Sequence, residues 1–142
     1  MSDRPQWLYR DLIVGPYVTL CLTEKEFHTE LRRMSPKITP PAFLQTSHAH
    51  ATAHHFENQK GDLCCVVCLG DCSGRRGVEV AGLLVHEAVH IWQEFAARIG
   101  ENSPSAEFEA YAIQSISQRL MAEFERRITK KKGKKNDFFG PK

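Results

Sequence analysis

The sequence predicts a single α+β domain in which a small antiparallel sheet packs against helices. Residues 16–22 alternate between apolar and polar side chains and are rich in β-forming types, which predicts a strand. Residues 63–70 form a short apolar run between turn residues, which is typical of a buried strand. Two longer segments, residues 78–100 and 101–128, begin and end with residues that favour helix termini.

The first predicted strand is followed by a short helix. Thr23 is placed to cap this helix, and Glu26 follows three residues later, as in a capping box. Phe27, Leu31 and Met34 then fall on one helical face. The next segment, residues 35–45, contains three prolines and predicts a loop.

Residues 48–70 predict a β-hairpin, with an extended segment at 48–56, a turn, and the buried strand. The first long helix should end at Gly100. For the second long helix, Ser103 is the predicted N-cap and Pro104 the first helical residue. Its apolar stripe comprises Ala106, Ala110, Ile113, Ile116, Leu120, Phe124 and Ile128.

The charge distribution separates a domain at residues 1–129 from a basic C-terminal tail at residues 130–142, which we expect to be flexible. The formal net charge is only +2, and the lysines of Lys130–Lys135 contribute most of the positive charge near the end. Nucleic acid is therefore an expected partner only through this tail. No apolar run approaches the ~20 residues that span a bilayer, so we expect no membrane association.

Five cysteines occur in the chain: Cys21, Cys64, Cys65, Cys68 and Cys72. The odd number, and charged residues where a signal peptide needs an apolar core, predict free thiols in a reducing compartment. We therefore expect a cytoplasmic protein. Cys65 and Cys68 have CxxC spacing, but side chains alternate along a strand, so four thiolates would not converge on one ion. We interpret these cysteines mainly as core side chains, with a second metal site or a redox role as weaker alternatives.

An HExxH motif lies in the segment LLVHEAVHIWQ, residues 83–93. His86 and His90 are four residues apart on the predicted helix, so their imidazoles can bind one ion. Glu87 is turned by about 100° from His86 and can act as a general base beside a metal-bound water. Because a catalytic zinc uses three protein ligands and one water, the motif predicts one Zn²⁺ per chain and a further ligand elsewhere.

Two glutamates near the start of the next predicted helix are candidates for this third ligand. Glu107 and Glu109 are two residues apart, so only one of them should reach the ion. Glu109 shares a side with Ile113 and Ile116, which should face the core, and a carboxylate in such a position needs a partner. We predict Glu109 as the ligand and keep Glu107 as the alternative.

The spacing His86-Glu87-x-x-His90, then eighteen residues, then Glu109, resembles the HExxH-x18-E arrangement of gluzincin metallopeptidases such as the leucyl and alanyl aminopeptidases. More specifically, residues 48–125 resemble small zinc metallopeptidases encoded by phages and prophages. The resemblance implies a zincin-like domain over residues 1–129, with zinc at His86, His90 and Glu109 and with Glu87 as general base. The chain lacks the GAMEN-type motif of the aminopeptidases, so endo- and exopeptidase activity both stay open.

These observations predict a hydrolase, a zinc metallopeptidase that cuts a peptide or protein substrate in the host cytoplasm or the virion. The candidates for stabilising the oxyanion are His54, His55, Tyr111 and Tyr17. His54 and His55 are favoured because they lie in the hairpin before the zinc helix, where a substrate could bind by strand addition. The alternatives are a non-catalytic zinc-binding protein of a phage assembly and a nucleic-acid binder that uses the lysine tail. The oligomeric state is not specified by the sequence.

Overall fold

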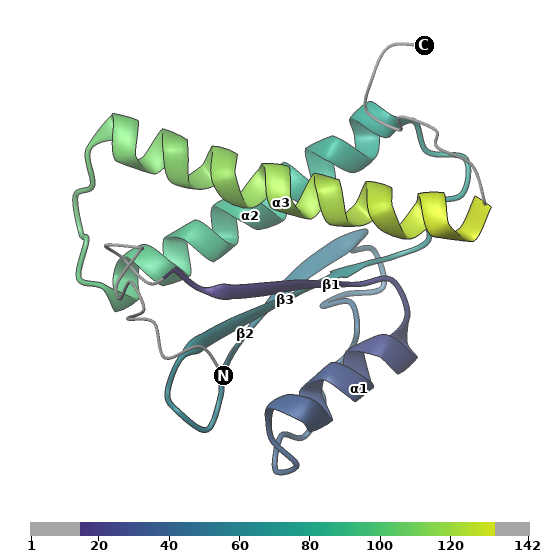
Figure 1. The fold of residues 1–142 in the computed structure, drawn as a ribbon, viewed down its shortest axis with the longest axis horizontal. Coiled ribbons are helices and arrows are strands. Elements are labelled where there is room, and N and C mark those ends of the chain that lie inside the picture. Colours follow the sequence, from purple (N-terminus) through teal and green to yellow (C-terminus); the bar gives the residue numbers. More distant parts are fainter. Residues whose placement is uncertain (1–14, 133–142) are drawn as a thin grey trace, which may run out of the picture.

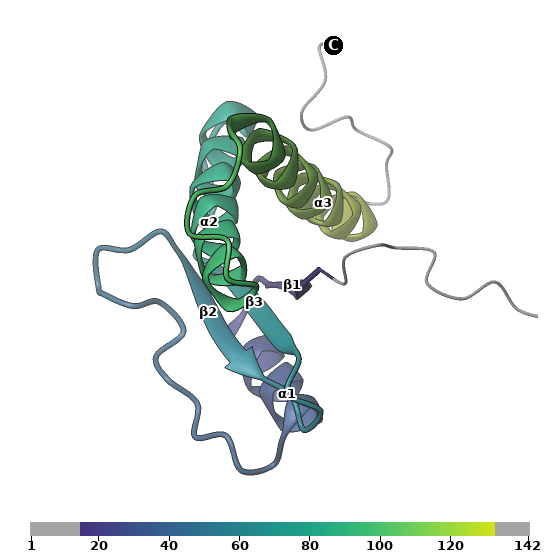
Figure 2. The same cartoon turned by 90° about the vertical axis from the view of Figure 1, so that its left-hand side faces the viewer.

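The structure, a computed structural model, describes residues 15–132. Its elements are, in chain order, β1 (Tyr17–Cys21), α1 (Glu24–Met34), β2 (Ala51–Glu57), β3 (Leu63–Leu69), α2 (Gly77–Arg98) and α3 (Ala106–Lys132). The predicted α+β class is confirmed. The sheet lies between two helical layers, with α2 and α3 on one face and α1 on the other (Figure 1). Seen from the side, α2 lies toward β2 and α3 toward β1 (Figure 2).

The sheet has the strand order β1-β3-β2 and is mixed. β2 and β3 are antiparallel neighbours, which confirms the predicted hairpin. β1 pairs with β3 in parallel, so the prediction of an antiparallel sheet is wrong for this pair. The reason lies in β3, which is buried at every position and therefore takes the centre of the sheet. The hairpin places β2 on one side of β3, and the long connection through α1 lets β1 join the other side in parallel.

Alternate residues of β3 pack into two separate cores. One core contacts α2 and α3, and its β3 members are Leu63, Cys65, Val67 and Leu69. The other core contacts α1 and contains Val66 and Cys68. This two-sided burial explains why the strand is a continuous apolar run instead of an alternating pattern.

The cysteines of β1 and β3 are core side chains, as predicted. All five cysteines are free, and all except Cys72 are buried. Burial raises the pKa of Cys21 to about 12 and that of Cys65 to about 12. These groups are therefore protonated thiols at neutral pH and behave as small apolar side chains.

The predicted helix ends are partly confirmed. Thr23 caps α1, since its Oγ1 accepts a hydrogen bond from the backbone N–H of Glu26 at 3.2 Å. The Glu26 carboxylate accepts from the backbone N–H of Leu22 at 2.8 Å, one residue before the position that a capping box would use. Gly100 follows the end of α2 with φ of +76°, the left-handed conformation expected there.

The predicted start of α3 is wrong by two residues. Ser105, not Ser103, is the N-cap, because its Oγ accepts from the backbone N–H of Phe108 at 3.2 Å. Pro104 consequently lies before the helix. The first residues of α3 that pack on the core are Phe108 and Ala112, not the predicted Ala106 and Ala110. The stripe from Ile113 to Ile128 packs on the core as predicted.

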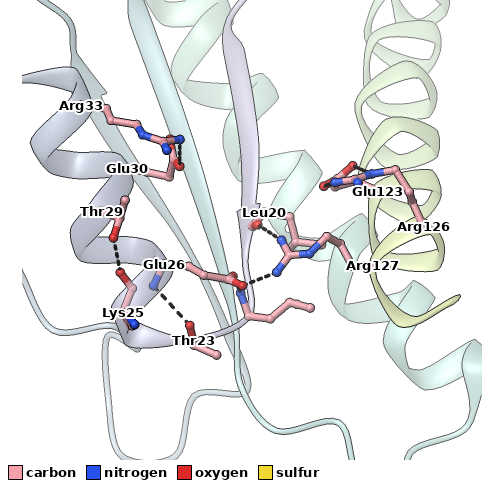
Figure 3. Close-up of polar contacts among 11 residues, drawn as sticks. Leu20, Thr23, Lys25, Glu26, Thr29, Glu30, Arg33, Glu123, Arg126 and Arg127 are labelled. Atoms are coloured by element: carbon pink, nitrogen blue, oxygen red, sulfur yellow. Dashed lines mark hydrogen bonds and ion pairs between the residues drawn. The ribbon is translucent and has the colours of Figure 1, made fainter. Parts of the chain in front are cut away.

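α3 extends to Lys132, so the first three residues of the predicted tail are helical. Residues 133–142 lie outside the described range. Near the end of α3, Arg127 donates a hydrogen bond to the carbonyl of Leu20 at 3.3 Å and also binds the carboxylate of Glu26 (Figure 3). Arg127 therefore ties α3 to the junction of β1 and α1. Among residues 15–132, no helix has the length and apolar character needed to cross a bilayer.

Candidate metal site

α2 presents two different faces, and the HExxH motif divides between them. The face turned toward the sheet and α3 is buried and comprises Val80, Leu84, Ala88, Ile91, Trp92 and Phe95. His86 and His90 fall outside this apolar face and are exposed, whereas Glu87 lies at its edge and is only 5% exposed. The helical period therefore places both imidazoles in solvent and Glu87 at the border of the buried face.

An open cleft of about 970 Å³ lies between α2 and β2. Its α2 wall includes His86, Glu87 and His90, and its β2 wall includes His55. Loop residues, among them Arg75, close one end. The motif is thus exposed to a space large enough for several residues of a peptide.

The two histidines converge on one point. Their Nε2 atoms are 3.1 Å apart, whereas two nitrogens bound to the same tetrahedral zinc would lie about 3.3 Å apart, given bonds of ~2.0–2.1 Å. Nδ1 of His90 lies 3.3 Å from Oε1 of Gln93. An amide oxygen only accepts, so this contact favours the tautomer with the proton on Nδ1 and the lone pair on Nε2, the form of the ring that binds a metal.

Glu87 lines the same cleft and has no polar partner. Within residues 15–132, no hydrogen bond or ion pair joins its carboxylate to another group, although it is only 5% exposed. Most of the side chain is buried in the helix packing, and the residue lines the open cleft. A group in this state, beside two converging imidazoles, suits a base that takes its proton from a molecule bound in the cleft.

The structure does not bring Glu109 to the two histidines. Oε2 of Glu109 accepts a hydrogen bond from the indole Nε1 of Trp92 at 2.8 Å. Trp92 follows His90 by two residues, so its side chain is turned by about 200° around α2. Neither Glu109 nor Glu107 lines the cleft. In the described part of the chain, no three His, Cys, Asp or Glu side chains are grouped as a metal ion requires.

Of the four residues proposed to stabilise an oxyanion, the structure places only His55 in the cleft. Its ring is half-buried, and Nδ1 lies 3.4 Å from Sγ of Cys65. Burial lowers the pKa of His55, while the nearby carboxylate of Glu94 partly opposes that shift. The imidazole is therefore neutral at pH 7 and retains one N–H donor.

The other three candidates lie elsewhere. His54 points to the opposite face of the sheet, where it stacks on Phe27 with ring centroids 4.8 Å apart and contacts the carbonyl of Phe43 through Nε2 at 3.0 Å. Adjacent residues of a strand face opposite ways, which explains why His54 and His55 separate. Tyr17 and Tyr111 are exposed and do not line the cleft.

Glu79, Glu94 and Arg75 are cleft residues that were not singled out in the sequence. Glu94 follows His90 by four residues and Glu79 precedes His86 by seven, so helical periodicity alone could have placed them on the same face. Arg75 comes from a loop, and no local pattern signals its position.

The available donors fit zinc at the histidine pair, since imidazole nitrogen is a preferred zinc ligand and carboxylates occur in the same cleft. Comparisons with protein-family models, with curated proteins and with solved structures find no match to this chain.

Proposed function

We propose that the chain is a zinc-dependent metallopeptidase that cuts peptide bonds in an extended segment bound between α2 and β2. The observation that carries the proposal is the convergence of the His86 and His90 Nε2 atoms, 3.1 Å apart, beside a glutamate that lines the same cleft and has no polar partner within residues 15–132. A structural zinc site would use four protein ligands and would not need Glu87. The resemblance to phage and prophage enzymes suggests action in the host cytoplasm or the virion.

His86 and His90 would hold the ion. Zinc bound there supplies a Lewis acid and a water whose pKa is lowered toward ~7. Glu87, at its carboxylate, would accept a proton from the attacking water and pass it to the leaving amine. Gln93 would keep the His90 ring in the tautomer that leaves Nε2 free.

β2 offers a binding edge for the substrate. It is an edge strand of the sheet, so the backbone groups on the side away from β3 are not paired with another strand within residues 15–132. An extended peptide can pair with such an edge and so run along the cleft past the histidines.

His55 is the proposed donor to the oxyanion. Because burial keeps Cys65 protonated, its S–H can donate to Nδ1 of His55. The remaining N–H, at Nε2, would then be available to a substrate oxygen in the cleft.

The first test is metal content together with activity. We expect about one zinc per chain after reconstitution. His90→Ala should lose it, and His28→Ala, on α1, should retain it. Glu87→Gln should retain zinc but lose hydrolysis of a peptide library. Absence of zinc in the reconstituted wild type would overturn the proposal, and zinc without hydrolysis would leave the non-catalytic role.

Glu109 remains our proposal for the third ligand, on the strength of its spacing from His90. Because Trp92 and His90 point to nearly opposite sides of α2, Glu109 would have to leave Trp92 and α3 would have to move relative to α2. Zinc affinity, measured by competition with a chelator, should fall at least tenfold in Glu109→Gln and stay near wild type in Glu107→Gln. Retention in Glu109→Gln with loss in Glu94→Gln would assign the ligand to the cleft instead.

A further inference from the structure

The cleft has two ends that differ in charge. α2 and β2 run side by side in the same direction, since Arg98, at the end of α2, pairs with Glu57, at the end of β2, at 2.7 Å. Glu94 also pairs with Arg98, so this end carries two carboxylates and one guanidinium. Arg75 lies at the other end, before α2 begins.

Arg75 is a half-buried cation that lines the cleft. Glu79 interacts with it electrostatically, but the Glu79 carboxylate accepts from the backbone N–H of Arg76 at 2.9 Å and from Arg76 Nε at 3.3 Å. Within residues 15–132, no hydrogen bond or ion pair engages the Arg75 guanidinium. A guanidinium has five donors in a planar fork that matches a carboxylate.

We propose that Arg75 binds a carboxylate of the substrate on the C-terminal side of the bond that is cut, so that acidic peptides are the preferred substrate class. The inference rests on the proposed peptidase function. A peptide that pairs antiparallel with β2 runs from the Glu57 end of the cleft toward the Ala51 end. Its C-terminal part therefore approaches Arg75, and its N-terminal part approaches the more acidic end.

The distance along α2 indicates which residue of the peptide would meet Arg75. Glu79, which lines the cleft with Arg75 and interacts with it electrostatically, precedes His86 by seven residues, or about 10.5 Å along the helix axis. An extended strand rises ~3.4 Å per residue, so this span corresponds to about three residues of peptide. The favoured residue is thus an Asp or Glu at the third position after the cut bond, or the terminal carboxylate of a substrate that ends there.

The test uses quenched fluorescent octapeptides, amidated at the C-terminus, with Asp, Asn or Lys fixed at each position in turn. For the wild type we expect kcat/KM to be about tenfold higher with Asp than with Asn at the third position after the cut, as for one charge-assisted contact. Arg75→Gln should abolish this preference, and Arg75→Glu should shift it to Lys. Arg76→Gln is the matched control, since Arg76 is the neighbouring arginine and does not line the cleft; it should keep the preference.

A second pair of peptides, which end three residues after the cut as a free acid or as an amide, distinguishes a terminal carboxylate from an acidic side chain. Cleavage by the wild type with the same preference in Arg75→Gln would overturn the assignment of Arg75 and leave the peptidase intact. A wild type that carries zinc and cuts no peptide would overturn both.

Discussion

At the scale of single residues, the orientation of His55 depends on its contact with Cys65. The ring reaches the cleft from β2, while Cys65, on the neighbouring strand, contacts its Nδ1 from the core at 3.4 Å. Cys65 does not line the cleft, and burial raises the pKa of its thiol to about 12. The protonated thiol is therefore placed to orient the imidazole from the core.

This arrangement predicts the effect of removing the ring. His55→Ala should lower kcat about 10²-fold with little change in KM, because a donor to the oxyanion acts mainly in the transition state. The control is His50→Ala, in which a second histidine of the same cleft is removed. Zinc content should be unchanged in both variants. Equal kcat values for the two variants would show that His55 is an ordinary wall residue.

The buried thiols also predict a pH dependence of stability. The pKa of Cys65 is raised from 9.0 to about 12 in the folded protein, so folding favours the protonated form. Its contribution is complete below pH 9 and is lost as the pH rises toward 12, at up to about 1.4 kcal/mol per pH unit. Urea unfolding at pH 8 and pH 10.5 should therefore show a smaller loss of stability in Cys65→Ala than in the wild type. Identical losses would contradict the prediction.

At the scale of elements, local chemistry was enough for some features and not for others. The Thr23 cap, the Gly100 end of α2 and the β2–β3 hairpin follow from residues that act on their own neighbours, and all three were predicted. The parallel partner of β3 was not, because a strand that is apolar on both faces shows that it is central without showing the direction of its neighbours. Two serines near the start of α3 can both act as caps, and packing selects Ser105.

The same contrast holds for the candidate site. The spacing of His86 and His90 fixes their convergence on any regular helix, so the motif alone predicts the pair. The position of Glu109 depends on how α3 packs against α2. In the structure its carboxylate accepts a hydrogen bond from Trp92. Arg75 lines the cleft from a loop, and periodicity in the sequence does not predict where a loop residue lies.

The connection of α3 to β1 and α1 gives a prediction for one arginine. Arg127, whose side chain is 21% exposed, donates to the Leu20 carbonyl and to Glu26, whose carboxylate in turn accepts from the Leu22 N–H (Figure 3). Arg127→Leu should therefore lower the free energy of unfolding by about 1–2 kcal/mol. Arg126→Leu is the control, because within residues 15–132 Arg126 pairs with Glu123 of its own helix on the surface, and this variant should unfold close to wild type. Urea denaturation of the two variants tests this prediction. Equal effects would show that Arg127 does not connect α3 to β1 and α1.

At the scale of the whole molecule, the cleft lies between parts of the fold that pack into different cores. Its walls come from α2, which packs on α3, and from the β-hairpin, which packs on α1 through its other face. A ligand that bridges these walls, or an ion held by α2 at their border, binds the native arrangement and not the unfolded chain. Binding must therefore be visible as a change in global stability.

Zinc should raise the stability of the entire domain by an amount that increases with the logarithm of its affinity for the native state. At a free zinc concentration about 1,000 times the Kd, the gain should be ~4 kcal/mol, and a chelator should reverse it. His90→Ala should show almost no gain, because a single remaining imidazole binds weakly, whereas His28→Ala should respond like the wild type. Thermal unfolding with and without zinc measures the effect for all three proteins. An equal gain in His90→Ala would place the zinc elsewhere on the chain, and the helix that carries HEAVH would then serve packing alone.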